Sequence, residues 1–398
     1  MRKFMRDIEM CLFKNVQERG YWIASIVALL TASSGSFNYF KLSPLIDSIA
    51  QEFATSYATI GFLAGIFAFS QLFLSIPIGV IVRPHNLKKA IAYALSLAII
   101  GSLIAGITSS IHLLFLGRIL EGASMAMGLV IASFLVAEAS TGERTGFGFG
   151  ILMTYMPIGN ILGLNVSSYM LMLSGWRGAW LMGIMLPAIA LLLLPMVKTT
   201  KRESGRELSY ARSLVMSGKS LLLGLIQMGL SVSSVGFLMW TPTFMVKSHG
   251  FDVGTASFIT SLFMIVGIPA CLFGGWLSDK AKSKEAMLTS CFALLTMLYP
   301  LTSLIPSPLL SPYIIIIGVL SGLIPVAINT WLVSLFGSSS SIGFGVLNTS
   351  RGFSMLIGPL IMGIILSYTT SWITSFTSLS IFTLLACIAS LLLARIKT

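Results

Sequence analysis

Twelve apolar segments, each long enough to cross a lipid bilayer, dominate the sequence. A helix rises about 1.5 Å per residue, so a hydrocarbon core of about 30 Å takes about 20 apolar residues. Only 10% of the 398 residues are charged and 56% are hydrophobic, whereas soluble domains carry about 25% charged residues. The composition therefore excludes a soluble fold and predicts an all-α membrane protein. The predicted spans are 21–45, 55–82, 90–108, 111–138, 146–170, 178–197, 220–246, 253–277, 287–305, 313–336, 341–368 and 371–394.

Basic residues fall on alternate loops of this arrangement. Twenty of the 25 Lys and Arg residues lie at the two ends of the chain and in the loops that follow the even-numbered spans. The other loops hold only Arg177 and Lys247. The positive-inside rule then places both termini in the cytoplasm of a multi-pass cell-membrane protein. The same loops account for the net charge of +12, so no nucleic-acid partner is predicted.

The first 20 residues are too polar for a span. Phe4, Ile8, Leu12 and Val16 follow one another at four-residue steps among charged residues. This spacing is typical of an amphipathic helix that lies flat on the cytoplasmic membrane surface. A frayed tail is the alternative, and the sequence does not separate the two.

An internal repeat divides the chain into two halves. Gly79 recurs as Gly275 and Trp176 as Trp372, each 196 residues later, and the run 148–154 recurs at 343–349. Such a repeat predicts a duplicated unit with both copies in the same orientation, and substrate bound near the midplane between them. We therefore expect two pseudo-symmetric six-helix bundles, 21–197 and 220–398, joined by a basic cytoplasmic linker, 198–219.

Several short motifs resemble those of the major facilitator superfamily of secondary transporters. The run 275–280 (GWLSDK) resembles the family's loop signature, and 143–146 (ERTG) resembles its junction before the fifth span. The run 118–124 (RILEGAS) is similar to its fourth-span motif, with Glu121 where glutamine is usual. The resemblance implies a twelve-helix transporter in which the first, fourth, seventh and tenth spans line a central cavity.

The resemblance also implies a gate between the halves, in which an acidic loop residue caps a facing helix. Asp279 follows Gly275 by four residues, but the position four after Gly79 is Arg83. A helix N-terminus favours a carboxylate and disfavours an arginine. We therefore expect Gly275 and Asp279 to form the intact half of the gate. Arg83 is expected either to pair with Glu138 or to anchor in lipid phosphates.

Four charged residues lie inside predicted spans: Lys41, Arg118, Glu121 and Arg351. A charge at a span centre costs about 2.5–3.5 kcal/mol on insertion scales, so each requires a reason. Three cations and one anion favour an anionic solute, and the planar fork of arginine suits a carboxylate. Arg118 and Glu121, three residues apart, are alternatively a structural ion pair. Arg351 has no charged counterpart in the repeat, because the equivalent residue is Met156.

Polar residues extend this pattern along helical faces. The first span carries Thr31, Ser34, Asn38 and Lys41 on one face, and Gln227 follows Thr31 by 196 residues. Glu121 is the candidate proton carrier, because it is the one acid deep in a predicted span. The candidate solute-binding residues are Arg118, Arg351, Lys41, Asn38, Gln227, Asn329 and Asn348.

The sequence thus predicts a secondary transporter that moves a small organic anion by proton-coupled alternating access, as a monomer in the lipid bilayer. Efflux of lipophilic, drug-like compounds is the alternative, and a membrane sensor that binds solute without moving it is a further one. The 22-residue linker is too short for a signalling domain, which disfavours the sensor. No metal-ligand spacing, cofactor motif or nucleophile–base pair indicates an enzyme.

Topology is testable by labelling single cysteines. We expect cysteines placed at Ser204 and Ser283 to react with impermeant reagents only from the cytoplasmic side, and one at Ser248 only from outside. Labelling of the cysteine at position 204 from outside would contradict the twelve-span arrangement.

Overall fold

The computed structural model describes residues 2–81, 87–139, 145–197, 218–280, 284–336 and 340–397. Those residues are almost entirely helical and include no strand. In the N-terminal half the elements are α1 (Arg2–Phe40), η1 (Ser43–Leu45), α2 (Ile46–Glu52), α3 (Tyr57–Ile81), α4 (Leu87–Ile107), α5 (Ile111–Ala139), α6 (Thr145–Met153), α7 (Tyr155–Leu181), η4 (Met182–Ile184), α8 (Met185–Leu193) and η5 (Leu194–Met196). In the C-terminal half they are α10 (Gly218–His249), α11 (Val253–Lys280), α12 (Lys284–Leu301), η6 (Thr302–Leu304), η7 (Ser307–Leu309), α13 (Leu310–Phe336), α14 (Ser340–Thr369) and α15 (Trp372–Lys397).

These elements provide twelve membrane crossings within the described part of the chain. Eleven helical stretches are long and apolar enough to span a bilayer, and one of them, Gly148–Met196, has 49 residues. At about 1.5 Å per residue that stretch is roughly twice the length one crossing needs. It divides at Gly175, whose φ of 72° interrupts α7. Only glycine adopts this left-handed conformation readily, so the fifth and sixth spans meet at Gly175.

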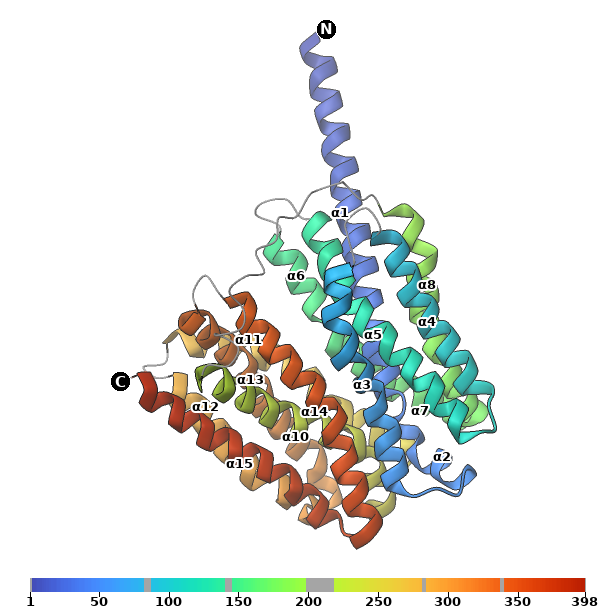
Figure 1. The fold of residues 1–398 in the computed structure, drawn as a ribbon, viewed down its shortest axis with the longest axis vertical. Helices are drawn as coiled ribbons and strands as arrows, with labels where there is room; N and C mark the ends of the chain where they lie inside the picture. The colour runs from blue at the N-terminus through green and yellow to red at the C-terminus, as the bar shows by residue number, and fades with distance from the viewer. Residues whose placement is uncertain are drawn as a thin grey trace.

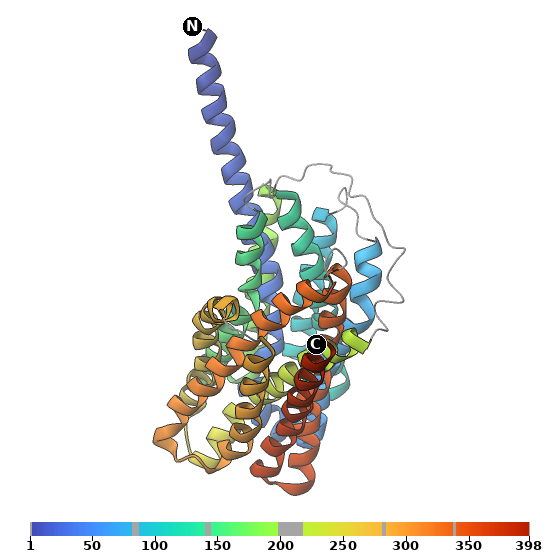
Figure 2. The same cartoon turned by 90° about the vertical axis from the view of Figure 1, so that its left-hand side faces the viewer.

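The N-terminal segment is helical and continues the first span, and its position on the membrane surface stays a prediction. Residues 2–20 continue α1 without a break, as part of one 39-residue helix. In both views the N-terminal turns of α1 project beyond the bundle (Figure 1, Figure 2). At its other end α1 stops at Phe40, five residues short of the predicted end of the span, and the chain turns into η1 and α2. Pro44 lies in η1, and proline lacks the N–H that a continuing helix would need.

The helices form two bundles that lie side by side (Figure 1). Corresponding close contacts within the two bundles keep the spacing of the sequence repeat. A β-carbon added to Gly122 on α5 would overlap the carbonyl oxygen of Phe67 on α3. In the other half, one added to Gly318 on α13 would lie 2.7 Å from the carbonyl oxygen of Phe263 on α11. Gly318 and Phe263 follow Gly122 and Phe67 by 196 residues each, so the two bundles pack in the same way at this contact.

Hydrogen bonds join the two bundles near the end of α1. The Ser43 hydroxyl lies 3.1 Å and 2.7 Å from the carbonyl oxygens of Leu238 and Met239 on α10, to which it donates. The Tyr39 hydroxyl donates to the carbonyl oxygen of Met355 on α14 at 2.8 Å. The end of the first span that is opposite the N-terminus is therefore attached to two helices of the C-terminal half.

Side chains next to these bonds extend the contact between bundles. The Tyr57 and Trp240 rings meet edge to face with centroids 5.4 Å apart. The Tyr57 hydroxyl donates to Asp47 at 2.7 Å, and Lys247 lies 3.6 Å from the same carboxylate. Most of these residues lie in η1 and α2 or toward the ends of α1, α3 and α10 that are opposite the N-terminus of α1, and Met355 lies at the middle of α14. The charge pattern of the loops assigns that end to the outside.

The close approach of α3 and α5 generates a stability prediction. In Gly122→Ala the new methyl group would overlap the Phe67 carbonyl, and such overpacking costs about 1–3 kcal/mol. We expect a lower melting temperature in detergent, measured by scanning fluorimetry. Gly150→Ala is the matched control, because a β-carbon there meets nothing within 4 Å. Equal melting temperatures for the two variants would contradict the packing described.

Candidate functional site

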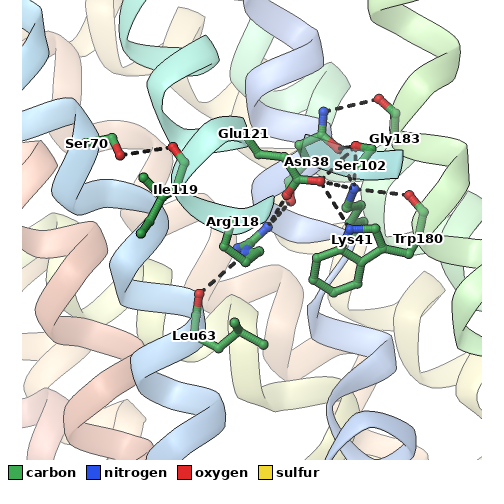
Figure 3. A network of polar contacts seen from close by, with 10 residues as sticks. All are labelled: Asn38, Lys41, Leu63, Ser70, Ser102, Arg118, Ile119, Glu121, Trp180 and Gly183. Atoms are coloured by element: carbon green, nitrogen blue, oxygen red, sulfur yellow. Dashed lines mark hydrogen bonds and ion pairs between the residues drawn. The ribbon is translucent and has the colours of Figure 1, made fainter. Parts of the chain in front are cut away.

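A cluster of polar side chains lies inside the N-terminal bundle, where four of its spans meet (Figure 3). Lys41 is the first residue after α1, and Asn38 precedes it by about one helical turn. Arg118 and Glu121 lie one turn apart on α5 and share a face of that helix. The remaining members are Ser102 on α4, Trp180 on α7 and the carbonyl of Gly183 in η4.

Glu121 lies at the centre of this cluster and accepts hydrogen bonds from four side chains. Its Oε1 atom is 2.7 Å from Lys41 Nζ, 2.8 Å from Ser102 Oγ and 3.2 Å from Trp180 Nε1. Its Oε2 atom is 3.1 Å from Arg118 Nη1. Both oxygens of Glu121 thus serve as acceptors, and the two cations of the cluster lie beside them.

Lys41 is satisfied as an ammonium ion. Its Nζ atom donates to Asn38 Oδ1 at 2.7 Å, to Glu121 Oε1 at 2.7 Å and to the Trp180 carbonyl at 3.1 Å. These are three acceptors for the three N–H groups of a protonated lysine. Ser102 Oγ lies 3.1 Å away as a fourth neighbour. The amine also lies 4.7 Å from the centroid of the Trp180 ring, within cation–π range.

Arg118 is only partly satisfied. Nε donates to the carbonyl of Leu63 at 3.3 Å, and Nη1 donates to the carbonyl of Asn38 at 2.6 Å and to Glu121. The guanidinium stacks over Phe67, 4.5 Å from the ring centroid. Nη2 is buried and has no hydrogen-bond partner in the described part of the chain. The N–H groups of Nη2 therefore remain unused as hydrogen-bond donors.

The cluster has no contact with solvent in this conformation. Lys41, Arg118 and Glu121 each have 0% exposure. The two predicted solute-binding cations of the cluster, Lys41 and Arg118, are therefore closed to a solute. Two cations and one anion leave a formal charge of +1 in the interior. Buried ions lose several kcal/mol of hydration each, which mutual attraction offsets only with good geometry. A net charge of +1 in this interior therefore raises the free energy of the folded state.

The C-terminal bundle fills the equivalent place with apolar side chains. The residues 196 positions after Arg118, Glu121 and Trp180 are Ile314, Ile317 and Phe376, all with 0% exposure. Phe237 on α10 packs against Phe376 with ring centroids 5.8 Å apart. The fold thus accommodates an apolar core at this position, and stability alone does not require the ion cluster. The alternative of a purely structural Arg118–Glu121 pair stays open as a prediction.

Arg351 lies apart from the cluster, on α14 of the other half. Its side chain is half-buried and within hydrogen-bonding reach of the hydroxyl of Tyr155, at the start of α7. Among the described side chains, no carboxylate lies within ion-pair distance of Arg351. The guanidinium thus faces a residue of the opposite bundle without a neutralising charge.

The other predicted solute-binding residues are dispersed. Gln227 on α10 is buried and donates to Ser231 Oγ at 2.7 Å, so its amide is occupied within its own helix. Asn329 on α13 is exposed. Asn348 lies on α14, and its side chain is outside the described set. The structure does not bring the amides of Gln227 and Asn329 to the ion cluster.

The predicted gate lies largely outside the described residues. Gly275 and Asp279 fall in the last two turns of α11, but the Asp279 side chain is not among those described. Glu138 is half-buried at the end of α5. Arg83 belongs to the segment 82–86, outside the described residues, so its pairing with Glu138 stays a prediction.

Ser102 and Trp180 are the cluster members that sequence reasoning missed. Trp180 lies one helical turn after the repeated Trp176, a spacing that favours a shared face. No pattern around Ser102 distinguishes it from other small polar residues in spans, which most often serve close helix packing.

The sequence agrees with this arrangement at the level of family. The model of the Major Facilitator Superfamily matches residues 24–359. The chain belongs to this superfamily. The uncharacterized transporter YycB of Bacillus subtilis is 25% identical over 342 residues, 83% of each chain. The uncharacterized transporter YgaY of Escherichia coli O157:H7 is 26% identical over 69% of this chain and 71% of its own. Azole resistance protein 1 of Saccharomyces cerevisiae is 25% identical over 43% of this chain and 28% of its own.

Solved structures share the fold. A bacterial homologue of the human lysosomal transporter Spinster, in an inward-facing and occupied conformation, superposes with a TM-score of 0.78 at 15% identity. The superposition covers 95% of this chain and 97% of that one. The nucleoside transporter NupG gives a TM-score of 0.75 at 16% identity, over 94% and 99% of the two chains. The predicted family, the twelve-helix fold and the transporter class are confirmed.

The charge balance of the cluster predicts opposite effects of two substitutions on stability. Glu121→Gln leaves two buried cations without a counter-ion, and removing one partner of a buried pair costs about 3–5 kcal/mol. Lys41→Met leaves the neutral Arg118–Glu121 pair and fills a similar volume. We expect a large fall in melting temperature for Glu121→Gln and an equal or higher value for Lys41→Met. A higher melting temperature for Glu121→Gln than for Lys41→Met would contradict the charges assigned to the cluster.

Proposed function

We propose that the protein transports a small organic anion across the cell membrane, coupled to protons, with Arg351 as the anchor for the anionic group. The observation that carries this proposal is the position of Arg351. It is a half-buried guanidinium between the two bundles, with no ion-pair partner among the described residues.

Tyr155 adds a second contact from the opposite bundle. A solute carboxylate bound by Arg351 on α14 would also be within reach of the Tyr155 hydroxyl on α7. A ligand held from both halves binds differently whenever the halves change their relative position. Only such differential binding lets a solute shift a conformational equilibrium. Arg351 and Tyr155 therefore meet the requirement that alternating access places on a central site.

We assign proton coupling to the cluster around Glu121, and the burial of this cluster supports the assignment. Ionisable groups inside membrane helices are rare and are typical of ion pathways and proton relays. The C-terminal bundle packs Ile314 and Ile317 at the corresponding positions. A charged core that the fold does not need is most simply explained by transport.

The contacts between the bundles support a cycle in which the outer side opens and closes. Ser43, Tyr39 and Tyr57 contact the C-terminal bundle at the end that the positive-inside rule assigns to the outside. With the termini in the cytoplasm, as the charge pattern predicts, this conformation is closed toward the outside. Opening requires these contacts to break.

Efflux of lipophilic compounds remains the second candidate. The observation in its favour is the likeness to azole resistance protein 1, which covers 43% of this chain. An efflux site for such compounds needs apolar walls and no anion anchor, so the two candidates differ in their dependence on Arg351.

Uptake into proteoliposomes tests the anion proposal. A panel of labelled mono- and dicarboxylates is offered with and without an imposed pH gradient. For the carboxylate that is taken up, Arg351→Gln should weaken binding ten- to hundredfold, because a charge-assisted hydrogen bond contributes about 1.5–3 kcal/mol. Arg351→Lys should bind less well than the wild type, because it keeps the charge but loses the two-pronged geometry.

Lys89→Gln is the control, because it removes an exposed basic residue at the end of the molecule. It should leave the affinity unchanged. Unaltered carboxylate uptake by Arg351→Gln, or transport of azoles but of no carboxylate, would overturn the proposal.

A further inference from the structure

We propose that Lys41, and not Glu121, is the group that binds and releases the coupling proton. The inference rests on the proposed proton coupling and names the atom at which it occurs, Nζ of Lys41. It reassigns Lys41 from the predicted solute-binding set to a proton-binding site inside the N-terminal bundle.

Charge balance separates the two candidates. As the structure stands, Lys41 and Arg118 are positive and Glu121 is negative, so the cluster carries +1. Protonation of Glu121 would raise this to +2 and leave two buried cations, Lys41 and Arg118, on either side of one neutral carboxyl group, without a counter-ion. Loss of a proton from Lys41 would lower it to zero. In a low-dielectric interior the neutral state is strongly favoured over a doubly charged one.

The hydrogen-bonding capacity of Glu121 leads to the same choice. Four donors already converge on its two oxygens. A protonated carboxyl group becomes a donor at one oxygen and needs a free acceptor. The groups that contact Glu121 are the donors of Lys41, Ser102, Arg118 and Trp180, so a proton on Glu121 would displace at least one of them.

Lys41, in contrast, has partners for both of its protonation states. The ammonium form uses Asn38 Oδ1, Glu121 Oε1 and the Trp180 carbonyl as its three acceptors. When the transport cycle opens the cluster to water, one N–H bond breaks, its electron pair stays on Nζ and the proton passes to the water that enters. The neutral amine then needs one donor, and the Ser102 hydroxyl, 3.1 Å away, is able to rotate toward it.

The Ser102 hydroxyl is placed for this exchange. It donates to Glu121 Oε1 at 2.8 Å while Lys41 is charged, and Asn38 Oδ1 lies 3.3 Å away. If it turns to Lys41, Glu121 Oε1 still accepts from the Trp180 indole, and Oε2 from Arg118. No group of the cluster loses its last hydrogen bond in either state.

The described elements packed around Lys41 Nζ add no charged group to the cluster other than Glu121 and Arg118. α4 contributes Ser102, and α7 contributes the ring and carbonyl of Trp180. α1 contributes Asn38, and its Tyr39 hydroxyl interacts with Arg118. The charged groups that face Lys41 are Glu121 and Arg118, both on α5. α3 contributes the carbonyl of Leu63 and the ring of Phe67, both to Arg118. η4 places Gly183 next to Nζ, and its carbonyl accepts from Asn38.

The position of Lys41 in the chain connects its charge to the contact between bundles. Lys41 follows the last residue of α1 and precedes Ser43 by two residues. Ser43 donates to the carbonyls of Leu238 and Met239 on the other bundle. A neutral amine attracts Glu121 less strongly, so deprotonation loosens the hold on this short segment. The same segment makes the outer contact.

A difference titration of the detergent-solubilised full chain, without solute, tests the assignment. Wild type and Lys41→Met are titrated at equal concentration through the neutral pH range, and bound protons are counted. We expect the wild type to release one proton per molecule more than Lys41→Met. Lys247→Met, which removes a half-exposed lysine at the outer end, is the matched control and should equal the wild type.

Identical curves for the wild type and Lys41→Met would overturn the proposal. Lys41→Gln serves as a second variant should Lys41→Met not yield folded protein, which a melting curve determines beforehand. Because no transported solute is needed, the result is independent of whether Arg351 proves to bind an anion.

Infrared difference spectra over the same pH range test the rival carrier. If Glu121 took the proton, a carboxylic-acid C=O band would appear and would change frequency in Glu121→Asp. We expect no band that responds to this substitution. Appearance of such a band would assign the proton to Glu121 and refute the role of Lys41.

Discussion

A single carboxylate shared by two cations, fully buried from solvent, connects the spans of the N-terminal bundle. Glu121 lies on α5, and its oxygens receive donors from the end of α1, from α4 and from α7. In a low-dielectric interior each of these contacts is strong when made and costly when broken. Movement of any one of the four spans therefore disturbs the others. The cluster links the position of the first span to the protonation of the core.

This arrangement explains the different characters of the two bundles. The C-terminal bundle keeps the same close helix contacts, as the pair Gly318 and Phe263 shows, but it places Ile314, Ile317 and Phe376 where the N-terminal bundle has the ion cluster. Replacing a buried ion cluster with apolar residues is often neutral or stabilising. The N-terminal bundle thus retains the less favourable core. Functional sites are where proteins carry such local destabilisation, which supports the proposed role of the ionic core in the transport cycle.

The sequence predicted the elements well and their relative rotation poorly. The twelve crossings follow from hydropathy, and the break at Gly175 falls between the predicted fifth and sixth spans. The close spacing of Arg118 and Glu121 follows from helical periodicity. That Lys41 meets Glu121, 80 residues away, does not, because periodicity fixes which residues share a face of one helix and not which face meets a neighbour.

The first span shows the same limit at its two ends. The apolar run predicted a helix to residue 45, but the structure ends α1 at Phe40, which is why Lys41 is free to turn toward Glu121. At the other end, four-residue spacing predicted a separate surface helix or a frayed tail, and residues 2–20 instead prolong α1. Hydropathy locates apolar segments, but a helix continues as long as its backbone hydrogen bonds do.

The bonds that Ser43 and Tyr39 make to the other bundle all end on backbone carbonyls, those of Leu238, Met239 and Met355. A carbonyl is supplied by every amino acid. Mutations at these three positions therefore preserve the acceptor, whatever the side chain becomes. After a gene duplication, an attachment of this kind lets one copy accumulate substitutions without a matching change in the other. Such contacts survive while the side chains of the two halves diverge, as they have where one half holds the ion cluster and the other holds Ile314, Ile317 and Phe376.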